Sequence, residues 1–300
     1  MSKELKHRIA TIISKCVPDK FYIKAVHRLY TRKKLNLKAP KTFNDKIQWY
    51  KLYYRVPLLT RCADKVKVYD YVKECGLEHI LTKRYGVYNS PGEIDFSDLP
   101  EDCFLKCNHN SAGNYHWKKR ENANTEKIRK KFKKMLAVNH FALSREWAYK
   151  NIDPKIICEE YLNVSAPEKF VDYNFFCFNG EPKLVLYNLG LCAENGDHAD
   201  GQRAVLDTNF NPVDMITGLE PLQSDKIVKP DNFEEMLEYA RILSKPFPQV
   251  RVDFFHVDGK IHFGELTFYS GSGFGTFEPY KWQEQMGDWF VLPEKTIVEK

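Results

Sequence analysis

Hydrophobic residues in the first part of the chain predict a mainly helical region over 1–62. Thr42 precedes Asp45 by three positions, which is the spacing of a capping box at the start of a helix. The aromatic residues Trp49 and Tyr53 extend the helix that begins there. We therefore expect a helical N-terminal region that precedes the rest of the fold.

Three further helices are predicted where apolar residues recur at intervals of three and four. They cover 63–75, 124–150 and 232–243. Asn124 or Thr125 is expected to cap the second of them. The positions that carry the spacing are Val66, Tyr69, Val72 and Lys73, then Ile128, Phe132, Met135 and Leu136, and finally Phe233, Met236, Leu237 and Ala240.

Short apolar runs between these helices are typical of strands. The predicted strands are 80–88, 103–107, 155–161, 172–178, 182–189, 250–256 and 261–268. Asn179-Gly180 and Asp258-Gly259 each separate two strands by a turn pair that favours a hairpin. A helical start, a mixed middle and an end rich in antiparallel pairs together predict an α+β fold.

The totals are those of a soluble globular protein, with 300 residues and 43% hydrophobic side chains. No apolar run reaches the roughly 18–20 residues of a membrane span, and the apolar stretch 9–13 is too short for a convincing signal peptide. Eight cysteines are scattered without a C-x-x-C pair, which favours reduced core residues and a cytoplasmic location.

The net charge of +6 is modest, and the basic residues concentrate in 24–51 and 118–134. A charge run of this kind is usually a solvated face, and we expect no nucleic-acid partner. A basic face still suits anionic substrates such as nucleotide triphosphates or acidic sugars.

Three oxygen-bearing side chains converge on the last predicted hairpin. Asp253 lies on its first strand, while Glu265 and Thr267 lie two positions apart on its second strand and so point to one face. Asp253 can reach that face from the neighbouring strand. Two carboxylates and a hydroxyl suit Mg²⁺, although a solvated hairpin face without a metal is the alternative.

Two earlier segments suggest nucleotide binding. Lys106 ends an apolar strand and is followed by the small-residue loop NHNSAGN, whose backbone N–H groups could wrap a phosphate chain. The apolar strand IICEEYL runs into two acids and an aromatic residue, and it could clamp an adenine and a ribose. A solvated lysine and an ordinary strand end are the alternatives, so the case depends on the order of these segments.

That order resembles the ATP-grasp superfamily, and within it the teichuronopeptide-biosynthesis (TupA-like) branch associated with bacterial surface polysaccharide synthesis. The resemblance spans nearly the whole chain. The segments that carry it are LNLKAPKTFNDKIQWYKLY, CADKVKVYDYVKECG, LPEDCFLKCNHNSAGN, IICEEYL, DYNFFCFNGEPKLV and RVDFFHVDGKIHFGELTFYSGSG. It implies that 63–300 form an ATP-grasp domain in which two α+β lobes clamp ATP. The first lobe, 63–158, would hold the phosphate loop, and the second, 159–300, the metal-binding hairpin.

The resemblance also implies roles for single residues. The expected ATP contacts are Lys65, Lys106, Ser111, Gly113, Glu159, Glu160, Tyr161, Leu162 and Asp172. The expected Mg²⁺ ligands are Asp253, Glu265 and Thr267, and the expected contacts of the reacting phosphate are Arg251, Arg203 and His109. Because neighbouring strand residues point to opposite faces, only one of Glu159 and Glu160 can meet the ribose.

Two departures from the superfamily pattern concern the metal and the phosphate loop. Thr267 stands where an asparagine is common, and a hydroxyl is the poorer metal ligand. Asn110 and Ala112 replace the usual glycines and leave only Gly113 in the loop. Since alanine does not readily adopt positive φ, the loop is expected to cover the phosphates less closely.

The implied activity is a carboxylate–amine ligase that uses ATP and Mg²⁺ and forms an amide through an acyl phosphate. Family context suggests a uronic acid of a capsular or cell-surface polysaccharide as the acid, with an amino acid or small amino alcohol as the amine. Two alternatives stay open. One is a glycosyltransferase, although no D-x-D motif follows an apolar strand, and the other is an ATP-grasp-type kinase that stops at phosphate transfer. The sequence leaves the oligomeric state undetermined.

Overall fold

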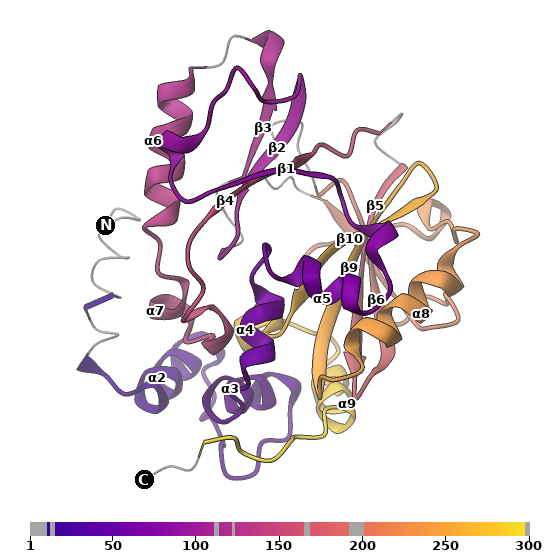
Figure 1. The fold of residues 1–300 in the computed structure, drawn as a ribbon. Coiled ribbons are helices and arrows are strands. Elements are labelled where there is room, and N and C mark those ends of the chain that lie inside the picture. Colours follow the sequence, from indigo (N-terminus) through magenta and orange to yellow (C-terminus); the bar gives the residue numbers. More distant parts are fainter. Residues whose placement is uncertain are drawn as a thin grey trace.

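The computed structural model describes residues 11–12, 16–110, 114–121, 124–164, 169–191 and 201–297. Within this part of the chain the fold is α+β, as predicted, with helices packed around two sheets (Figure 1). The helices are α2 (Asp19–Thr31), α3 (Phe43–Tyr53), α4 (Pro57–Ala63), α5 (Val68–Glu74), α6 (Thr125–Leu136), α7 (His140–Ser144), α8 (Phe233–Ser244) and α9 (Lys281–Trp289). The strands are β1 (Arg84–Tyr88), β2 (Asp102–Cys107), β3 (Tyr115–Lys118), β4 (Ile156–Glu160), β5 (Phe170–Phe178), β6 (Glu181–Leu189), β7 (Gln202–Leu206), β8 (Glu220–Pro221), β9 (Gln249–Val257) and β10 (Lys260–Thr267).

The smaller sheet has the strand order β1-β4-β2-β3, with antiparallel neighbours throughout. Helix α6 covers one face of this sheet through the buried side chains of Ile128 and Phe132 (Figure 1). Alternation along β2 places Cys103 and Leu105 in the same apolar cluster. Lys106 therefore points to the opposite face of the sheet, away from α6.

The larger sheet has the strand order β10-β9-β5-β6-β7-β8. Helix α8 covers one of its faces, where Phe233 packs beside Tyr173 and Phe175 of β5. On the other face Phe176 packs edge-on against Phe43 of α3, with 5.8 Å between the ring centroids. Because side chains alternate along a strand, the even-numbered residues of β5 share this second face. The end of this face near Phe176 is apolar and lies under α3, whereas the other end of the face carries polar side chains.

Helix α3 links the N-terminal helices to the segment that follows β10. Its cap is confirmed, since the hydroxyl of Thr42 accepts a hydrogen bond from the N–H of Asp45 at 3.2 Å. Further along the helix, Asn44 donates to the carbonyl of Gly275 at 2.9 Å, and Gln48 donates to the neighbouring carbonyls 272 and 273. The helix thereby holds the chain that leaves the hairpin.

Replacing Thr42 by alanine is expected to lower the free energy of unfolding by about 1 kcal/mol, because the N–H of Asp45 loses its acceptor. Urea denaturation of the purified protein measures this change. Thr42→Ser keeps the hydroxyl and serves as the control, expected within about 0.5 kcal/mol of the wild type. An alanine variant as stable as the wild type would contradict the assigned cap.

The predicted helix over 63–75 is wrong at its start. Residues 64–67 form a turn between α4 and α5. The helix breaks at Asp64, whose backbone is extended and whose carboxylate accepts from the N–H of Val66 at 2.9 Å. A short acidic side chain that bonds its own backbone in this way competes with helix formation. The predicted end is confirmed, because Gly76 follows α5 with a φ of 78°.

Other boundaries also differ from prediction. The helix expected over 124–150 is split into α6 and α7, and the strand expected from residue 80 begins only at Arg84. The pattern does not predict β3, β7, β8 or α9. Both hairpins are confirmed, since Asn179 and Asp258, with the glycine after each, adopt positive φ.

The cysteines lie mostly in the core, as predicted. Five are buried, namely Cys62, Cys103, Cys107, Cys158 and Cys177, and burial raises the pKa of the Cys62, Cys107 and Cys177 thiols to about 12. Cys16 is exposed and so departs from this expectation, and Cys192 lies outside the described residues. Among the described helices, none has the length and apolar character needed to cross a membrane.

Candidate active site

The β9–β10 hairpin sets Asp253 and Glu265 directly opposite each other. Their Cα atoms are register partners, and the register shifts between Phe263 and Glu265. Gly264 lies at this shift, and a Cβ built on it would be 2.9 Å from the backbone oxygen of Asp253. Only glycine permits so close an approach of the two strands, so Gly264 helps to place the two carboxylates side by side.

Arg251 and Thr267 complete a group of four polar side chains on this face of the hairpin. Arg251 Nε donates to Asp253 Oδ1 at 2.7 Å, and Arg251 Nη2 donates to the hydroxyl of Thr267 at 3.2 Å. Thr267 donates in turn to Glu265 Oε1 at 3.0 Å. We predicted Arg251 as a contact of the reacting phosphate, and the structure pairs it with the buried carboxylate of Asp253.

A polar stripe continues from the hairpin across the larger sheet. Asn174 is the register partner of Asp253, and its amide donates to Asp172 Oδ1 at 2.6 Å. Asn188 of β6 donates to Asn174 Oδ1 at 2.9 Å, and Arg203 of β7 donates to Asn188 through Nε. Two predicted site residues, Asp172 and Arg203, therefore belong to one hydrogen-bonded row with the hairpin.

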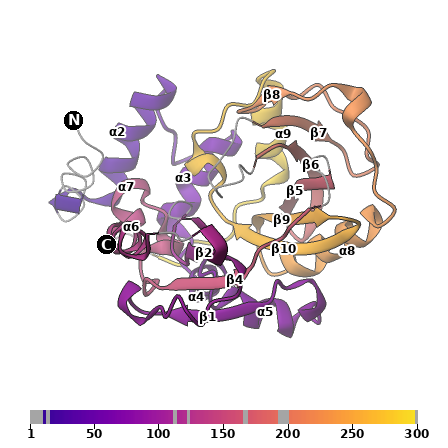
Figure 2. The ribbon, with the colours of Figure 1, turned by 90° about the horizontal axis from the view of Figure 1, so that it is seen from above.

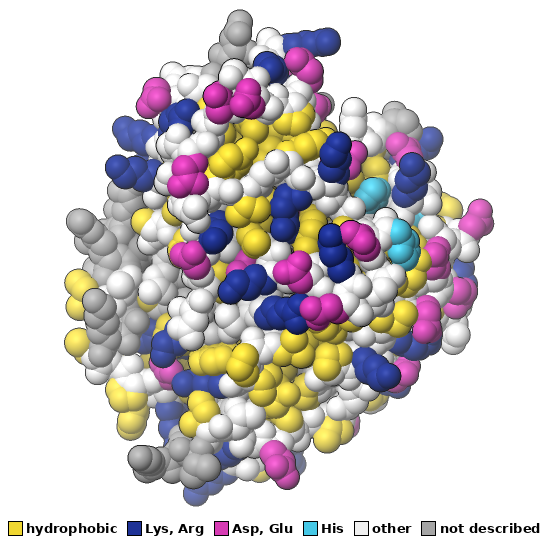
Figure 3. Space-filling model, viewed as in Figure 1, with side chains coloured by type: hydrophobic (Ala, Val, Ile, Leu, Met, Phe, Trp, Pro, Cys, Tyr) yellow, Lys and Arg dark blue, Asp and Glu magenta, His cyan; other side chains and the backbone are white. Residues whose placement is uncertain are grey.

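Lys65 links the chain that follows β2 of the smaller sheet to the β9–β10 hairpin. Its Nζ lies 3.1 Å from Glu265 Oε2 and donates to the backbone oxygen of Asn110 at 3.2 Å. Figure 2 shows the smaller sheet beside the β9–β10 edge of the larger one. Figure 3 shows lysine or arginine and acidic side chains gathered near the middle of the face seen in Figure 1. Lys65 thus joins the start of the predicted phosphate loop to the predicted metal site.

The turn that carries Lys65 is held from two sides. The N–H of Lys65 donates to the backbone oxygen of Asn108, and the amide of this buried residue donates to Asp64 Oδ1 at 2.8 Å. Arg84 donates to the carbonyls of Lys65 and Val66 at 3.0 and 3.3 Å. The break in the predicted helix is therefore what positions this lysine.

Lys106 and Glu159 form an ion pair on the face of the smaller sheet that lies away from α6. Tyr69 of α5 donates to Glu159 Oε2 at 3.3 Å, and the guanidinium of Arg84 stacks 3.7 Å from the Tyr69 ring centroid. Glu159 is buried and Glu160 is exposed, as strand alternation predicts. Lys106, a predicted ATP contact, thus lies beside the segment that is predicted to clamp the adenine and ribose.

Three further predicted residues, Tyr161, Leu162 and His109, lie around the ends of the smaller sheet. The ring of Tyr161 stacks on His116 of β3, with 3.5 Å between centroids, and Leu162 follows β4 in irregular structure. His109 is buried and its Nε2 lies 3.2 Å from the backbone oxygen of Val138, so its ring faces the interior of this lobe. Ser111 and Gly113 lie outside the described residues. The roles of these residues stay predictions.

The electrostatics of the cluster follow from burial and from close opposite charges. Lys65 lowers the pKa of Glu265 to about 2, with a further contribution from Arg251. Burial raises the pKa of Asp253 to about 7 and that of Asp172 to about 6, and Arg251 opposes both rises. Glu265 is thus the carboxylate that stays ionised most readily in this group.

The hairpin side chains fit a magnesium ion by their chemistry. Asp253 and Glu265 offer carboxylate oxygens on adjacent strands, and Thr267 adds a hydroxyl on the same face. Hard oxygen ligands of this kind are those that Mg²⁺ prefers, together with phosphate oxygens. Among the described residues no group of three or more His, Cys, Asp and Glu side chains is placed to hold a metal. The two carboxylates and the hydroxyl are thus the oxygen ligands that this face of the hairpin offers.

The sequence is matched over residues 45–291 by a family model described as TupA-like ATPgrasp. The chain belongs to this family. It therefore has an ATP-grasp fold, in which helices pack around the two sheets. The match begins inside α3, whereas the predicted ATP-grasp domain begins at residue 63, and the predicted lobe boundary between 158 and 159 falls within β4. These boundaries stay predictions.

Solved structures similar to the TupA-like chain include three ligases and synthetases. One is the ATP-grasp ligase PsnB complexed with minimal precursor, at 12% identity and a TM-score of 0.41, covering 79% of this chain and 62% of that one. Another is D-alanine–D-alanine ligase from Bacillus anthracis, at 16% identity and a TM-score of 0.39, covering 70% and 59%. The third is D-cycloserine synthetase DcsG, at 12% identity and a TM-score of 0.41, covering 78% and 70%. The chain thus spans about three fifths of the length of the first two, and no curated protein matches its sequence.

Three residues that help to build the site were not predicted. Asn174 and Asn188 extend the polar row across β5 and β6, and Gly264 allows the approach of the hairpin strands. The two asparagines leave a signal in the sequence, because each interrupts an apolar strand. Asn174 lies two positions after Asp172 and so shares its face, and Asn188 is the register partner of Asp172. Gly264 leaves a weaker one, as an isolated glycine within a strand.

Proposed function

We propose that this ATP-grasp enzyme is an ATP- and Mg²⁺-dependent carboxylate–amine ligase. A carboxylate oxygen of the substrate attacks the γ-phosphorus of ATP, the bond to the bridging oxygen breaks, and ADP leaves an acyl phosphate behind. An amine then attacks the acyl carbon, inorganic phosphate leaves, and the amine loses a proton as the amide forms. The proposed acid is a uronic acid of a capsular or cell-surface polysaccharide, and the proposed amine is an amino acid or small amino alcohol.

The contact between Lys65 and Glu265 carries this proposal. It sets a lysine beside a carboxylate of the hairpin at 3.1 Å, and the same side chain donates to the backbone oxygen of Asn110 in the predicted phosphate loop. A triphosphate between the two lobes would meet the lysine on one side. On the other side Asp253 and Glu265 would hold Mg²⁺, which supplies charge neutralisation at the phosphates when it is bound.

Each lobe has a separate task in the proposed reaction. Lys65 and Lys106 orient the phosphate chain, and residues 159–162 hold the adenine and ribose, with Glu160 as the exposed carboxylate. Arg251 and Arg203 provide fixed positive charge on the sheet face that carries Asp253, close to where the acyl phosphate would form. Positioning and charge stabilisation of this kind need no protein nucleophile.

The proposal is tested by following ADP release from the full-length protein with ATP, Mg²⁺, galacturonic acid and each of several amino acids. A ligase releases ADP only when both an acid and an amine are present, and the amide appears by mass spectrometry. ADP release with the acid alone, together with a stable phosphorylated acid, would identify a kinase instead. Turnover of a nucleotide sugar without any use of ATP would overturn the proposal in favour of a glycosyltransferase.

Lys106→Gln is expected to weaken ADP binding by about tenfold, because a charged hydrogen bond to phosphate contributes about 1.5–3 kcal/mol and Glu159 already pairs with part of this charge. Calorimetric titration with ADP and Mg²⁺ measures the change. Lys130→Gln, which removes an exposed charge from α6, is the matched control and should leave the affinity unchanged. Equal affinity of the Lys106 variant and the wild type would remove Lys106 from the nucleotide site.

A further inference from the structure

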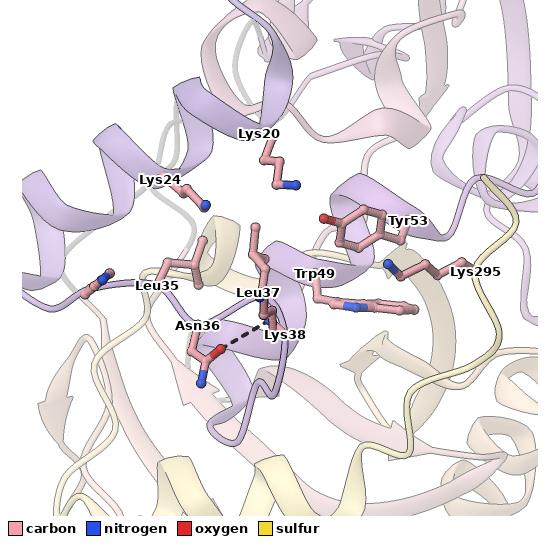
Figure 4. A pocket seen from close by; sticks show the side chains of 10 residues that line it. Lys20, Lys24, Leu35, Asn36, Leu37, Lys38, Trp49, Tyr53 and Lys295 are labelled. Atoms are coloured by element: carbon pink, nitrogen blue, oxygen red, sulfur yellow. Dashed lines mark hydrogen bonds between the residues drawn. The ribbon is translucent and has the colours of Figure 1, made fainter. Parts of the chain in front are cut away.

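A large pocket opens on the flank of α3, away from the catalytic hairpin. Its volume is about 810 Å³, and it lies between α2, the segment 34–38, α3 and the chain near Lys295 (Figure 4). Trp49 and Tyr53 line it from α3, and Leu35 and Leu37 line it from the connecting segment. A cavity of this size is within the range that holds small organic ligands.

The charged lining of this pocket is entirely positive. The five charged residues that line it are Lys20, Lys24, Lys34, Lys38 and Lys295. Figure 4 shows Lys20 and Lys24 extending from α2 on one side and Lys295 beside Tyr53 on the other. Lys295 Nζ lies 4.1 Å from the Tyr53 ring centroid, so the aromatic ring holds this charge at the pocket. Like charges brought together at one cavity favour an anionic occupant.

The surrounding sequence adds to this excess of positive charge. Residues 19–41 contain eight lysines and arginines and one acid, a larger excess than the +6 of the whole chain. That acid, Asp19, faces Arg55 at 2.9 Å and Arg145 at 3.1 Å, so its charge is already offset. Within the described part of the chain, Lys24, Lys34 and Lys38 have no ion-pair partner. The charges of Lys24, Lys34 and Lys38 are therefore available to a ligand.

We propose that this pocket binds an acidic oligosaccharide, with the lysines contacting its carboxylates and the apolar lining contacting its sugar rings. Pyranose rings carry apolar C–H faces between their charged groups, which matches lysines interspersed with Trp49, Leu35 and Leu37. Polyphosphate has no apolar surface to offer these side chains. A planar membrane surface would not fill a concave pocket into which the lysines extend.

Helix α3 connects this pocket to the proposed reaction site. Trp49 and Tyr53 face the pocket, while Gln48 and Lys51 bond residue 272 in the segment that follows β10. A bound polymer would therefore be held one helix away from the segment that leaves the metal hairpin. The role of the pocket as an anchor for the acid substrate rests on the proposed function, whereas the binding of an acidic oligosaccharide does not.

The test measures binding of trigalacturonic acid to the full-length protein at low and physiological salt. The triple variant K24Q/K34Q/K38Q removes three exposed charges from the pocket and is expected to weaken binding at least tenfold. The variant K127Q/K130Q/K133Q removes three exposed charges from α6 and serves as the matched control, expected within twofold of the wild type. Maltotriose, which lacks carboxylates, is expected not to bind.

Several outcomes would overturn this inference. Equal losses of affinity for the trimer in the two triple variants would mean that only the net charge of the protein matters. Failure of the wild-type protein to bind the trimer at low salt would exclude the site. Binding of polyphosphate or of phosphatidylglycerol vesicles in preference to the trimer would assign the surface to another ligand. ADP release with monomeric acid and amine is expected to be equal in both triple variants and the wild type. A failed ligase assay with intact trimer binding would thus count against the proposed function alone.

Discussion

Glu265→Gln is expected to lower the rate of ADP release at least about 10³-fold while the protein stays folded. The substitution keeps the shape of the side chain but removes the negative charge that faces Lys65 at 3.1 Å and lies opposite Asp253. Without that charge, the hairpin would offer a single carboxylate to Mg²⁺, and the phosphates would lose part of their neutralisation. A factor of 10³ corresponds to about 4 kcal/mol of transition-state stabilisation.

Folding and catalysis can be separated for this variant because Glu265 is partly exposed, with 35% of its side chain accessible. The free energy of unfolding in urea is expected to fall, because the ionised Glu265, whose pKa Lys65 lowers to about 2, favours the folded state. The protein is still expected to unfold cooperatively from a native state, since Lys65 keeps its bond to the backbone oxygen of Asn110. Glu284→Gln, which removes an exposed acid from α9, is the control and should retain full activity. ADP release by the Glu265 variant at the wild-type rate would exclude Glu265 from the metal site.

The local elements were predictable where a chemical signature marks them. The Asn179-Gly180 and Asp258-Gly259 turns need positive φ, and these residue pairs adopt it at low cost, so both hairpins follow from the sequence. The order of strands does not follow in the same way. Asn174 pairs with Asp253 across nearly 80 positions of chain, and no local pattern specifies that pairing. The β-rich half was therefore predicted without its sheet order.

The candidate site shows the same division. That Asp253 and Glu265 lie on one hairpin was predictable from its turn, but their register was not. The turn alone would pair Asp253 with Gly264, and the shift at Gly264 brings Glu265 opposite Asp253 instead. The approach of Lys65 was not predictable from periodicity, which favours a continuous helix through its position. What places the lysine is the bond between Asp64 and Asn108, which ends α4 and ties the turn to the end of β2. Tertiary hydrogen bonds of this kind override local helix propensity.

A second large effect is expected at Lys51, which lies buried beneath the segment that follows β10. Its Nζ donates to the backbone oxygens of Ser144 and Ser272 at 3.0 and 2.7 Å and to the hydroxyl of Ser272 at 2.8 Å. The buried carboxylate of Glu146 interacts with the same charge. Lys51 thus ties α3 both to the chain that leaves the metal hairpin and to the end of α7.

Lys51→Met is expected to lower the free energy of unfolding by about 3 kcal/mol, because it leaves the backbone oxygens of Ser144 and Ser272 without this donor and removes the positive charge near the buried Glu146. Methionine fills nearly the same volume, so a cavity contributes little to the loss. Urea denaturation measures the change. Lys67→Met removes an exposed lysine from the turn between α4 and α5 and is the control, expected within about 0.5 kcal/mol of the wild type.

The difference in unfolding free energy between wild type and Lys51→Met is expected to depend on pH. This dependence distinguishes the loss of a buried charge from a general loss of packing. Burial lowers the pKa of Lys51 to about 8, whereas lysine in the unfolded chain has a pKa of about 10.4. Between these values the unfolded chain binds more protons than the folded protein, so Lys51 favours folding increasingly as pH rises. The difference in unfolding free energy between wild type and Lys51→Met is therefore expected to grow from pH 8 to pH 10. A difference that stays constant or shrinks over this window would show that Lys51 is not a buried charge in the folded protein.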